Sequence, residues 1–287
     1  AGVPINRFGS ATQRARYLPA VCSGESICAH AISEPHAGSD AFAMKTTARA
    51  RAGSYLLAGS KTFITNGPLA DLFVVYAMTD RARGAIGGTS AFLVPRTTPG
   101  LTLGKAVAKL GMRTAPLCDL YFDDCEIPET QLLGEVGLGF PILDFVMKWE
   151  ILMSFAVSLG EMHHRLELCI EYAKTRTQFG QAIGKFQSVA NKLVDMRIGL
   201  EVSRSTLYRT AERVQKGENA SMDVALTKLL VSEHNLASAL HAVQIFGGHG
   251  YMSEVGLELD LRNAVGGTLY SGTSEVQRDR IAKLMGL

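Results

Sequence analysis

The chain has 287 residues, 47% of them hydrophobic, and its 29 basic and 27 acidic side chains leave a net charge of +2. This is the composition of a globular chain with one large or two modest cores, and the scattered charges disfavour a nucleic-acid-binding surface. No apolar run reaches the roughly 18 residues needed to cross a bilayer, so we expect a cytoplasmic protein without a membrane span.

The first part of the chain reads as a short helix followed by strands. Residues 10–18 carry a helical pattern, and from about Gly24 to Pro128 the chain is broken repeatedly by glycine and proline. The apolar runs between these breaks are short and rich in β-forming residues, which indicates antiparallel strands. The predicted strands cover residues 54–57, 72–77, 90–94 and 117–122.

From Gly137 onward the chain consists of long segments with few breakers. We expect helices over residues 142–175, 186–216 and 222–246, and their lengths favour packing in a bundle. Strands followed by helices predict an α+β fold, with an antiparallel, β-barrel-like domain before a C-terminal four-helix bundle. No Gly-x-Gly-x-x-Gly motif follows a predicted strand, which disfavours a Rossmann domain.

Neither the cysteines nor the histidines suggest a metal site. Five cysteines are an odd number without a Cys-x-x-Cys pair, so we expect reduced, mostly buried thiols. His163 and Glu167 share a helix face near His164 and Glu161, but the sequence offers no second pair of ligands. A solvated helix face explains them, and we expect no metal.

Glu150 is the most unusual acid in the sequence. It lies in residues 145–153 (FVMKWEILM), which are apolar on nearly every side, and no basic residue stands three or four positions away. A buried carboxylate without a partner is costly, and such residues concentrate at functional sites. Two structural alternatives stay open: stabilisation at a helix N-terminus, or an ion pair with an arginine of another helix.

Five segments, in order, resemble motifs of the acyl-CoA dehydrogenase family. They are residues 31–40 (AISEPHAGSD), 61–67 (KTFITNG), 176–180 (RTQFG) continuing to 186–187 (FQ), 244–250 (QIFGGHG) and 269–278 (LYSGTSEVQR). Any one alone is weak, but together they are highly specific, and the resemblance spans about Ser10 to Leu287. It implies an FAD flavoprotein acting on acyl thioesters, at least dimeric and usually tetrameric, that passes electrons to a flavoprotein or to O₂.

The resemblance also implies a division of the chain. We expect residues 1–21 to be a remnant of the family's N-terminal helical domain, residues 22–130 the β domain, and residues 131–287 the helical bundle. Most of the N-terminal domain, which in relatives helps to form the acyl pocket, has no counterpart in this sequence.

The matched positions imply contacts with FAD and substrate. Ile32 and Ser33 would face the pyrimidine edge of the flavin, Phe63 its ring and Thr65 the region of N5. Contacts with substrate are expected at Ser39 and Tyr270. Other matched positions reach, in relatives, the adenosine and pyrophosphate of FAD held by a neighbouring subunit: Arg176, Gln178, Phe179, Gln187, Gln244 and Gly248. Thr273 and Glu275 match further FAD positions, and Glu275 departs from the glutamine often found there.

The motif around residue 271 departs from the family at its most important position. Many relatives carry there the glutamate that removes the substrate's α-proton, but here the residue is Ser271, which cannot act as that base unaided. Its backbone N–H can still hold a thioester carbonyl. Glu150 falls where a minority of the family places the catalytic glutamate on a helix, although Ile151 replaces the usual following arginine. We therefore expect Glu150 to be the base, with Ser271 supplying its amide.

The serine paired with a helical glutamate looks most like a branch of the family that oxidises acyl or aminoacyl groups on carrier proteins. Two other functions on the same fold stay open. One is oxidation or hydroxylation with O₂, and the other is a non-catalytic subunit that shares FAD.

Overall fold

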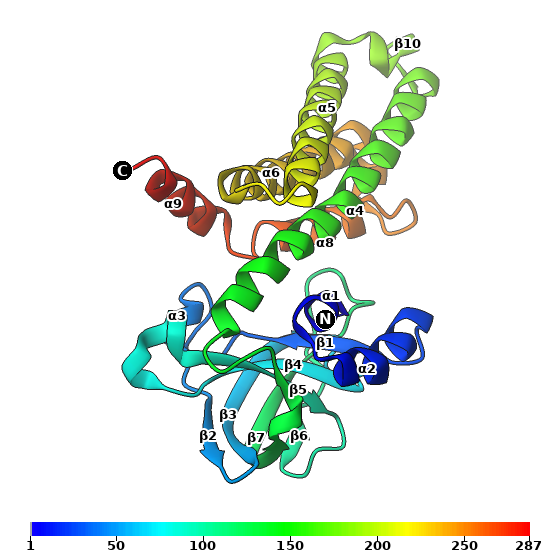
Figure 1. Cartoon of the computed structure of the whole chain (residues 1–287). Helices are drawn as coiled ribbons and strands as arrows, with labels where there is room; N and C mark the ends of the chain where they lie inside the picture. Colours follow the sequence, from blue (N-terminus) through cyan, green and yellow to red (C-terminus); the bar gives the residue numbers. More distant parts are fainter. Residues whose placement is uncertain (1) are drawn as a thin grey trace. The chain divides into compact units, whose positions relative to one another are not determined.

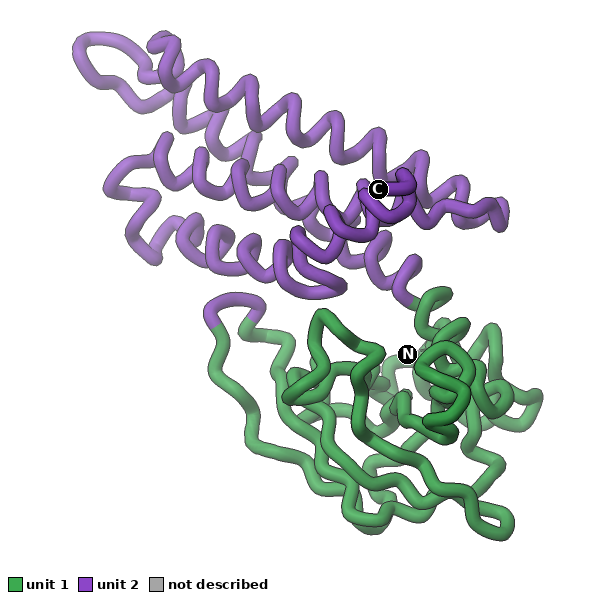
Figure 2. Tube along the Cα trace, turned by 90° about the vertical axis from the view of Figure 1, so that its left-hand side faces the viewer, with its two compact units in different colours: residues 1–109, 113–146 green, residues 110–112, 147–287 purple. Residues whose placement is uncertain are grey.

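The computed structural model describes residues 2–287, and the chain separates into two compact units (Figure 2). The β unit comprises the residues up to 109 and residues 113–146, and the helical unit comprises residues 110–112 and 147–287. The boundary falls inside the long helix α4 (Gly139–Thr175), whereas the resemblance implied a helical bundle that starts at residue 131. One continuous helix thus begins in the β unit and continues in the helical unit.

Two helices precede the sheet, α1 (Gly2–Phe8) and α2 (Ala11–Ser23). The predicted helix is confirmed as α2, and Ser10 caps it: its hydroxyl accepts from the Gln13 amide at 3.1 Å, while the Gln13 side chain accepts from the Ser10 amide at 3.0 Å. This reciprocal pair satisfies two amides at the helix start that otherwise have no partner.

Within the described residues, eight strands form one sheet in the order β6-β7-β3-β2-β4-β5-β8, with β1 paired to β4 (Figure 1). The strands are β1 (Cys28–Ala31), β2 (Thr47–Arg51), β3 (Ser54–Thr65), β4 (Leu72–Met78), β5 (Thr89–Pro95), β6 (Leu101–Leu103), β7 (Leu117–Pro128) and β8 (Leu132–Leu133). Short helices intervene: η1 (Ala41–Ala43), η2 (Arg81–Arg83), α3 (Gly84–Gly88) and η3 (Glu129–Gln131).

The four predicted strands are confirmed as parts of β3, β4, β5 and β7. Their expected antiparallel pairing is confirmed, β3 with β7 and β4 with β5, and β4 in addition pairs in parallel with β1 and, at one position, with β2. Parallel strands need buried surroundings on both faces, and β4 has them. Phe73 and Val75 enter one core, whereas Val74 and Tyr76 enter another that also contains Ile5 and Ile142.

The helical unit contains α4, α5 (Gln187–Gln215), α6 (Ser221–Phe246), α7 (Gly248–Tyr251), α8 (Leu257–Gly267) and α9 (Ser274–Leu284) (Figure 1). A small hairpin of β9 (Thr177–Gln178) and β10 (Gln181–Ala182), followed by η4 (Ile183–Lys185), joins α4 to α5. The three predicted helices are confirmed as α4, α5 and α6. Four helices share one core, to which Phe155, Leu200, Val231 and Leu257 belong.

All five cysteines are free thiols, and Cys118, Cys125 and Cys169 are buried as expected. Burial raises the pKa of Cys169 to about 12, so this thiol stays protonated at neutral pH. No helix in residues 2–287 combines the length and the apolar character that a membrane crossing requires.

Candidate active site

The structure brings the two candidate catalytic residues into contact. Glu150 lies in α4 next to the buried side chains of Ile151 and Leu152, and Ser271 lies in the loop between α8 and α9. The Ser271 hydroxyl donates a hydrogen bond to Glu150 Oε1 at 2.7 Å, although 121 positions separate the two residues in the chain. Both residues are half-buried. Glu150 therefore has a neutral partner from the predicted active-site loop, and no salt bridge to it is found among residues 2–287.

The loop that carries Ser271 is held in an unusual backbone conformation. Ser271 and Gly272 both have positive φ angles, of 54° and 85°. Gln277, which is buried, donates from Nε2 to the Ser271 carbonyl at 3.0 Å, and Thr273 caps α9 by accepting from the Val276 amide at 3.3 Å. A left-handed conformation is unfavourable for serine and persists only where the surroundings enforce it. These two hydrogen bonds hold the loop in that conformation.

The backbone N–H of Ser271 is available to a ligand. Within residues 2–287 it forms no hydrogen bond, while the hydroxyl and the carbonyl of the same residue are both engaged. An amide held in place and left without a partner suits the stabilisation of a developing oxyanion.

Tyr270 is fixed next to this pair. Its ring stacks on Phe155, with ring centroids 5.6 Å apart, and Ser158 hydrogen-bonds its phenol. Burial, followed by the negative charges of Glu161 and Glu150, raises the pKa of Tyr270 to about 12. The phenol therefore stays neutral and can donate or accept a hydrogen bond at any physiological pH.

A buried arginine connects the helices beneath this loop. Arg165 of α4 is fully buried and donates from Nη1 to the carbonyl and side-chain oxygens of Asn235, at 3.3 and 3.1 Å. Its Nε donates to Asp260 of α8 at 3.2 Å, and Asn235 in turn donates to Glu161 at 3.0 Å. This network ties α8, which leads into the Ser271 loop, to α4, which carries Glu150.

The β unit brings together two of the segments predicted to contact the flavin. The Ser33 carbonyl accepts from the Thr62 amide at 2.8 Å, so the end of β1 lies beside the end of β3. Phe63 has a φ of 57°, and 64% of its surface is exposed. Thr65 and Ser39 are exposed as well. An exposed aromatic ring beside backbone polar groups fits the face of a planar, mostly apolar ligand.

The predicted adenosine and pyrophosphate contacts lie elsewhere on the helical unit. The ring of Tyr172, near the end of α4, stacks on Phe246, near the end of α6, with centroids 3.9 Å apart. The six residues near these helix ends are all exposed: Arg176, Gln178, Phe179, Gln187, Gln244 and Gly248. Phe179 is 93% exposed in a left-handed conformation. The structure does not bring this group near Ser271, and Figure 1 shows the β9–β10 hairpin well away from α9.

Thr273 and Glu275 mark the start of α9. Hydrogen bonds from its own backbone amide and from Thr273 hold the pKa of Glu275 below its usual value, and Arg278 and Lys228 contribute attraction. A hollow of about 360 Å³ lies beside this helix start, lined in part by Ser274, Glu275 and Leu269. The start of α9 therefore stabilises the charged form of Glu275.

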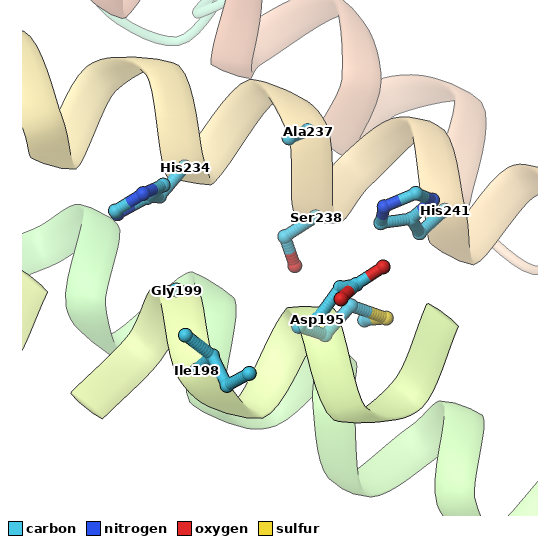
Figure 3. Close-up of a pocket in the computed structure, with 8 residues that line it drawn as sticks. Asp195, Ile198, Gly199, His234, Ala237, Ser238 and His241 are labelled. Atoms are coloured by element: carbon cyan, nitrogen blue, oxygen red, sulfur yellow. The ribbon is translucent and has the colours of Figure 1, made fainter. Parts of the chain in front are cut away.

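A second cavity, of about 270 Å³, lies between α5 and α6 (Figure 3). Ser238 projects from α6 towards the space above Asp195 of α5, and the His234 ring forms a hydrogen bond with the Ser203 hydroxyl at 2.9 Å. None of the predicted catalytic, cofactor or substrate residues lines this cavity. Among the described residues no cluster of His, Cys, Asp and Glu could hold a metal ion, and His163 pairs instead with Glu167 at 3.4 Å on an exposed helix face.

Sequence reasoning missed three contributions to the site. It assigned Ser271 only a backbone amide and overlooked the hydroxyl that meets Glu150. It also overlooked Gln277 and Ser158, which hold the Ser271 carbonyl and the Tyr270 phenol. Gln277 lies inside the matched motif, but no local pattern signals that its side chain turns back to the loop.

Two family models cover most of the chain. The model for the acyl-CoA dehydrogenase middle domain matches residues 29–125, and the model for the C-terminal domain matches residues 137–286. The first match lies mostly in the β unit, and the second covers the helical unit from residue 147 to residue 286 and begins ten residues before it.

Named relatives agree with the family models. L-prolyl-(peptidyl-carrier protein) dehydrogenase from a Serratia species is 41% identical over 285 residues, covering 99% of this chain and 74% of that protein. The crystal structure of the prolyl acyl carrier protein oxidase AnaB has a TM-score of 0.97 at 42% identity and covers 99% of this chain and 75% of its own. The FAD complex of PigA has a TM-score of 0.98 at 41% identity and covers 100% of this chain and 75% of its own.

Proposed function

The chain belongs to the acyl-CoA dehydrogenase family, and on that premise we propose that it catalyses the FAD-dependent α,β-dehydrogenation of an acyl thioester with Glu150 as the base. The observation that carries the proposal is the 2.7 Å hydrogen bond between Ser271 Oγ and Glu150 Oε1. It joins the helical carboxylate to the loop position where other members of the family carry their own glutamate.

Proton removal is the part of the reaction that falls to this chain. The α C–H bond of the thioester breaks, its electron pair stays on carbon, and the proton moves to the Glu150 carboxylate. Ser271 donates to one carboxylate oxygen, which leaves the other free to accept the proton.

Charge develops on the thioester oxygen as the α-proton leaves. The Ser271 N–H has no acceptor among residues 2–287 and can donate to that oxygen. The positive φ of Ser271, enforced by Gln277, fixes the direction of this amide before substrate arrives. A preorganised donor of this kind acts without reorganisation during the reaction.

Residues predicted to contact FAD occur in each unit. In the β unit Ile32, Ser33, Phe63 and Thr65 would hold the flavin end, and in the helical unit Thr273 and Glu275 would contact other parts of the cofactor. When bound, FAD supplies the acceptor for the β-hydrogen and its electron pair.

The remaining predicted contacts support an assembly of several copies. Six exposed residues are assigned to the adenosine and pyrophosphate of FAD in a neighbouring subunit: Arg176, Gln178, Phe179, Gln187, Gln244 and Gly248. The β9–β10 hairpin, which includes Gln178, lies away from α9 in Figure 1, so one copy would not use both groups for the same cofactor. The guanidinium of Arg176 suits pyrophosphate because it can grip two oxygens at once. The site as proposed is therefore complete only in a homodimer or homotetramer.

The proposed substrate is an aminoacyl group, L-prolyl first, carried as a thioester on a carrier protein. Relatives with 41–42% identity are named for L-prolyl or prolyl groups on carrier proteins. Tyr270, held neutral beside Glu150, offers a hydrogen-bonding group to a polar substrate such as the proline nitrogen. We propose an electron-accepting flavoprotein as partner. Because AnaB is called an oxidase, turnover with O₂ is the second candidate.

Anaerobic mixing of the flavin-loaded protein with a panel of thioesters tests this function. We expect prolyl carrier protein to bleach the flavin absorption band faster than butyryl-CoA does, and O₂ or an electron-transferring flavoprotein to restore the band. A protein that binds FAD but is reduced by no thioester would contradict the proposed reaction. A protein that forms peroxide without any thioester would favour the oxidase alternative.

A further inference from the structure

The end of β3 contains a strained bulge that presents an aromatic ring. Between Lys61 and Ile64 the pairing of β3 with β7 shifts register, so that β3 carries one residue more than β7 over this stretch. Phe63 occupies the bulge in a left-handed conformation, with 64% of its surface exposed. Bulky residues rarely adopt this conformation, and its persistence calls for a specific restraint.

A fully buried lysine supplies that restraint. Lys61 directly precedes the bulge, and its Nζ donates to the Ile32 carbonyl at 2.9 Å and to Glu34 Oε1 at 2.8 Å. Next to it the Thr62 amide donates to the Ser33 carbonyl at 2.8 Å, and the Thr62 hydroxyl donates to Asp119 at 2.6 Å. The bulge is thereby joined to the end of β1 through both backbone and side chains.

Glu34 is itself held by the backbone. Its two carboxylate oxygens accept from the Lys45 amide at 2.6 Å and from the Thr46 amide at 3.1 Å. Although burial acts to raise it, attraction to Lys61 and these hydrogen bonds keep the pKa of Glu34 below its usual value. The carboxylate therefore remains charged and provides a fixed anchor for the lysine.

We propose that Lys61 and Glu34 are positioning residues, which hold the Ile32–Ser33 end of β1 and the Phe63 bulge as one rigid surface for the flavin ring. The proposal rests on the proposed function, because that function assigns both segments to the flavin. A buried ion pair contributes little net stability compared with well-packed apolar residues, since desolvation offsets the attraction. An apolar pair cannot, however, bind the Ile32 carbonyl.

The test separates positioning from stability with three variants of the full chain. Lys61→Met keeps much of the side-chain volume and removes the cation, and Lys61→Met/Glu34→Leu removes both charges. Arg49→Met is the matched control, because it breaks the exposed 3.2 Å ion pair with Asp124 in the same sheet. Each variant is prepared without cofactor. The FAD Kd is measured by flavin fluorescence, the visible circular dichroism of bound flavin is recorded, and the Tm without FAD is determined.

We expect Lys61→Met to weaken FAD binding by about tenfold or more and to alter the flavin dichroism, corresponding to at least about 1.4 kcal/mol. The double variant should recover part of the Tm lost in Lys61→Met, because the Lys45 and Thr46 amides lose their acceptor, and should recover neither the Kd nor the dichroism. Arg49→Met should match the wild type in all three measurements. Recovery of FAD affinity together with Tm in the double variant would show that the pair is merely structural.

Glu34→Gln provides a milder variant should Lys61→Met fail to fold. Its amide oxygen can still accept from Lys61, while its NH₂ group cannot accept from the Lys45 amide, so we expect a folded chain with a lowered Tm and an FAD Kd about threefold higher. A wild-type Kd in Glu34→Gln would overturn the proposal. A wild-type chain that binds no FAD contradicts the proposed function and this inference together, whereas variants that all bind like the wild type contradict the inference alone.

Discussion

Exchanging the residues at positions 150 and 271 tests whether the helix and the loop face the same reacting carbon. In Glu150→Ser the carboxylate is lost, and in the double variant Glu150→Ser/Ser271→Glu it returns from the loop. Ser271 Oγ and Glu150 Oε1 are 2.7 Å apart. A glutamate carboxylate oxygen extends about 2.5 Å beyond the position of a serine Oγ, by two further bonds. The new carboxylate therefore reaches the space that the old one leaves.

The expected rates follow from these distances. A positioned base contributes about 10²–10⁴-fold, so Glu150→Ser should slow flavin reduction by about 10³-fold. A misplacement of about 1 Å costs about 10²-fold. The double variant should therefore recover at least about tenfold over Glu150→Ser and remain about 10–100-fold below the wild type.

Anaerobic single-turnover mixing, followed by flavin absorbance, measures these rates without the reoxidation step. Ser271→Glu alone is the control, because it places two carboxylates within contact distance and should react more slowly than the wild type. The reasoning would be refuted by a double variant that keeps its FAD spectrum and Tm yet reacts no faster than Glu150→Ser.

Three further predictions concern single residues. Ser271→Ala should slow flavin reduction by no more than about tenfold, because one hydrogen bond to a half-buried carboxylate is lost while the backbone amide remains. A decrease in the reduction rate as large as that of Glu150→Ser would contradict the assignment of Glu150 as the base. Burial, with added repulsion from Lys61, lowers the pKa of His30 to about 3, and its Nε2 contacts the Tyr76 hydroxyl at 2.7 Å. Between about pH 6.5 and 3 the unfolded chain therefore binds one proton more than the folded chain. As the pH is lowered through this window, the free energy of unfolding should fall by up to about 1.4 kcal/mol per pH unit. Urea unfolding at pH 7 and 4.5 should show that the free energy of unfolding of His30→Gln depends less on pH than that of the wild type. An equal dependence in the two proteins would contradict the lowered pKa of His30. Burial likewise lowers the pKa of Lys228 to about 8, so stability should rise as the pH increases from 8 towards 10.5. Lys228→Met should flatten that rise, and an unchanged profile would place this ammonium group in solvent.

The long helices and the central strands could be predicted because their patterns are local. The extended segments with few breakers gave α4, α5 and α6, and the unbroken apolar run of β4 reflects burial on both faces. The parallel pairing of β1 with β4 could not be predicted in this way, because it joins segments far apart in the chain. The helices α8 and α9 have only 11 residues each and are flanked by glycine or serine-rich turns, so their short lengths gave too little signal to predict them.

In the candidate site, too, single residues could be predicted from the sequence and long-range contacts could not. The sequence identified Glu150 and Ser271 as individual residues, but not the hydrogen bond between them, which depends on how α4 meets the α8–α9 loop. Lys61 lies in a motif attributed to the flavin, yet nothing local indicates that its ammonium is buried against Glu34. A lysine in a strand is ordinarily expected on the solvent face.

Replacement of Glu150 by glutamine tests the central claim most directly, because it keeps the shape of the side chain and an acceptor for Ser271 while removing the base. With a thioester that has no β-hydrogen, α-proton loss can be followed alone, as exchange with D₂O measured by NMR. We expect the wild type to catalyse this exchange and Glu150→Gln to lose it by about 10³-fold with FAD still bound. Undiminished exchange in Glu150→Gln would contradict the assignment of this carboxylate as the base.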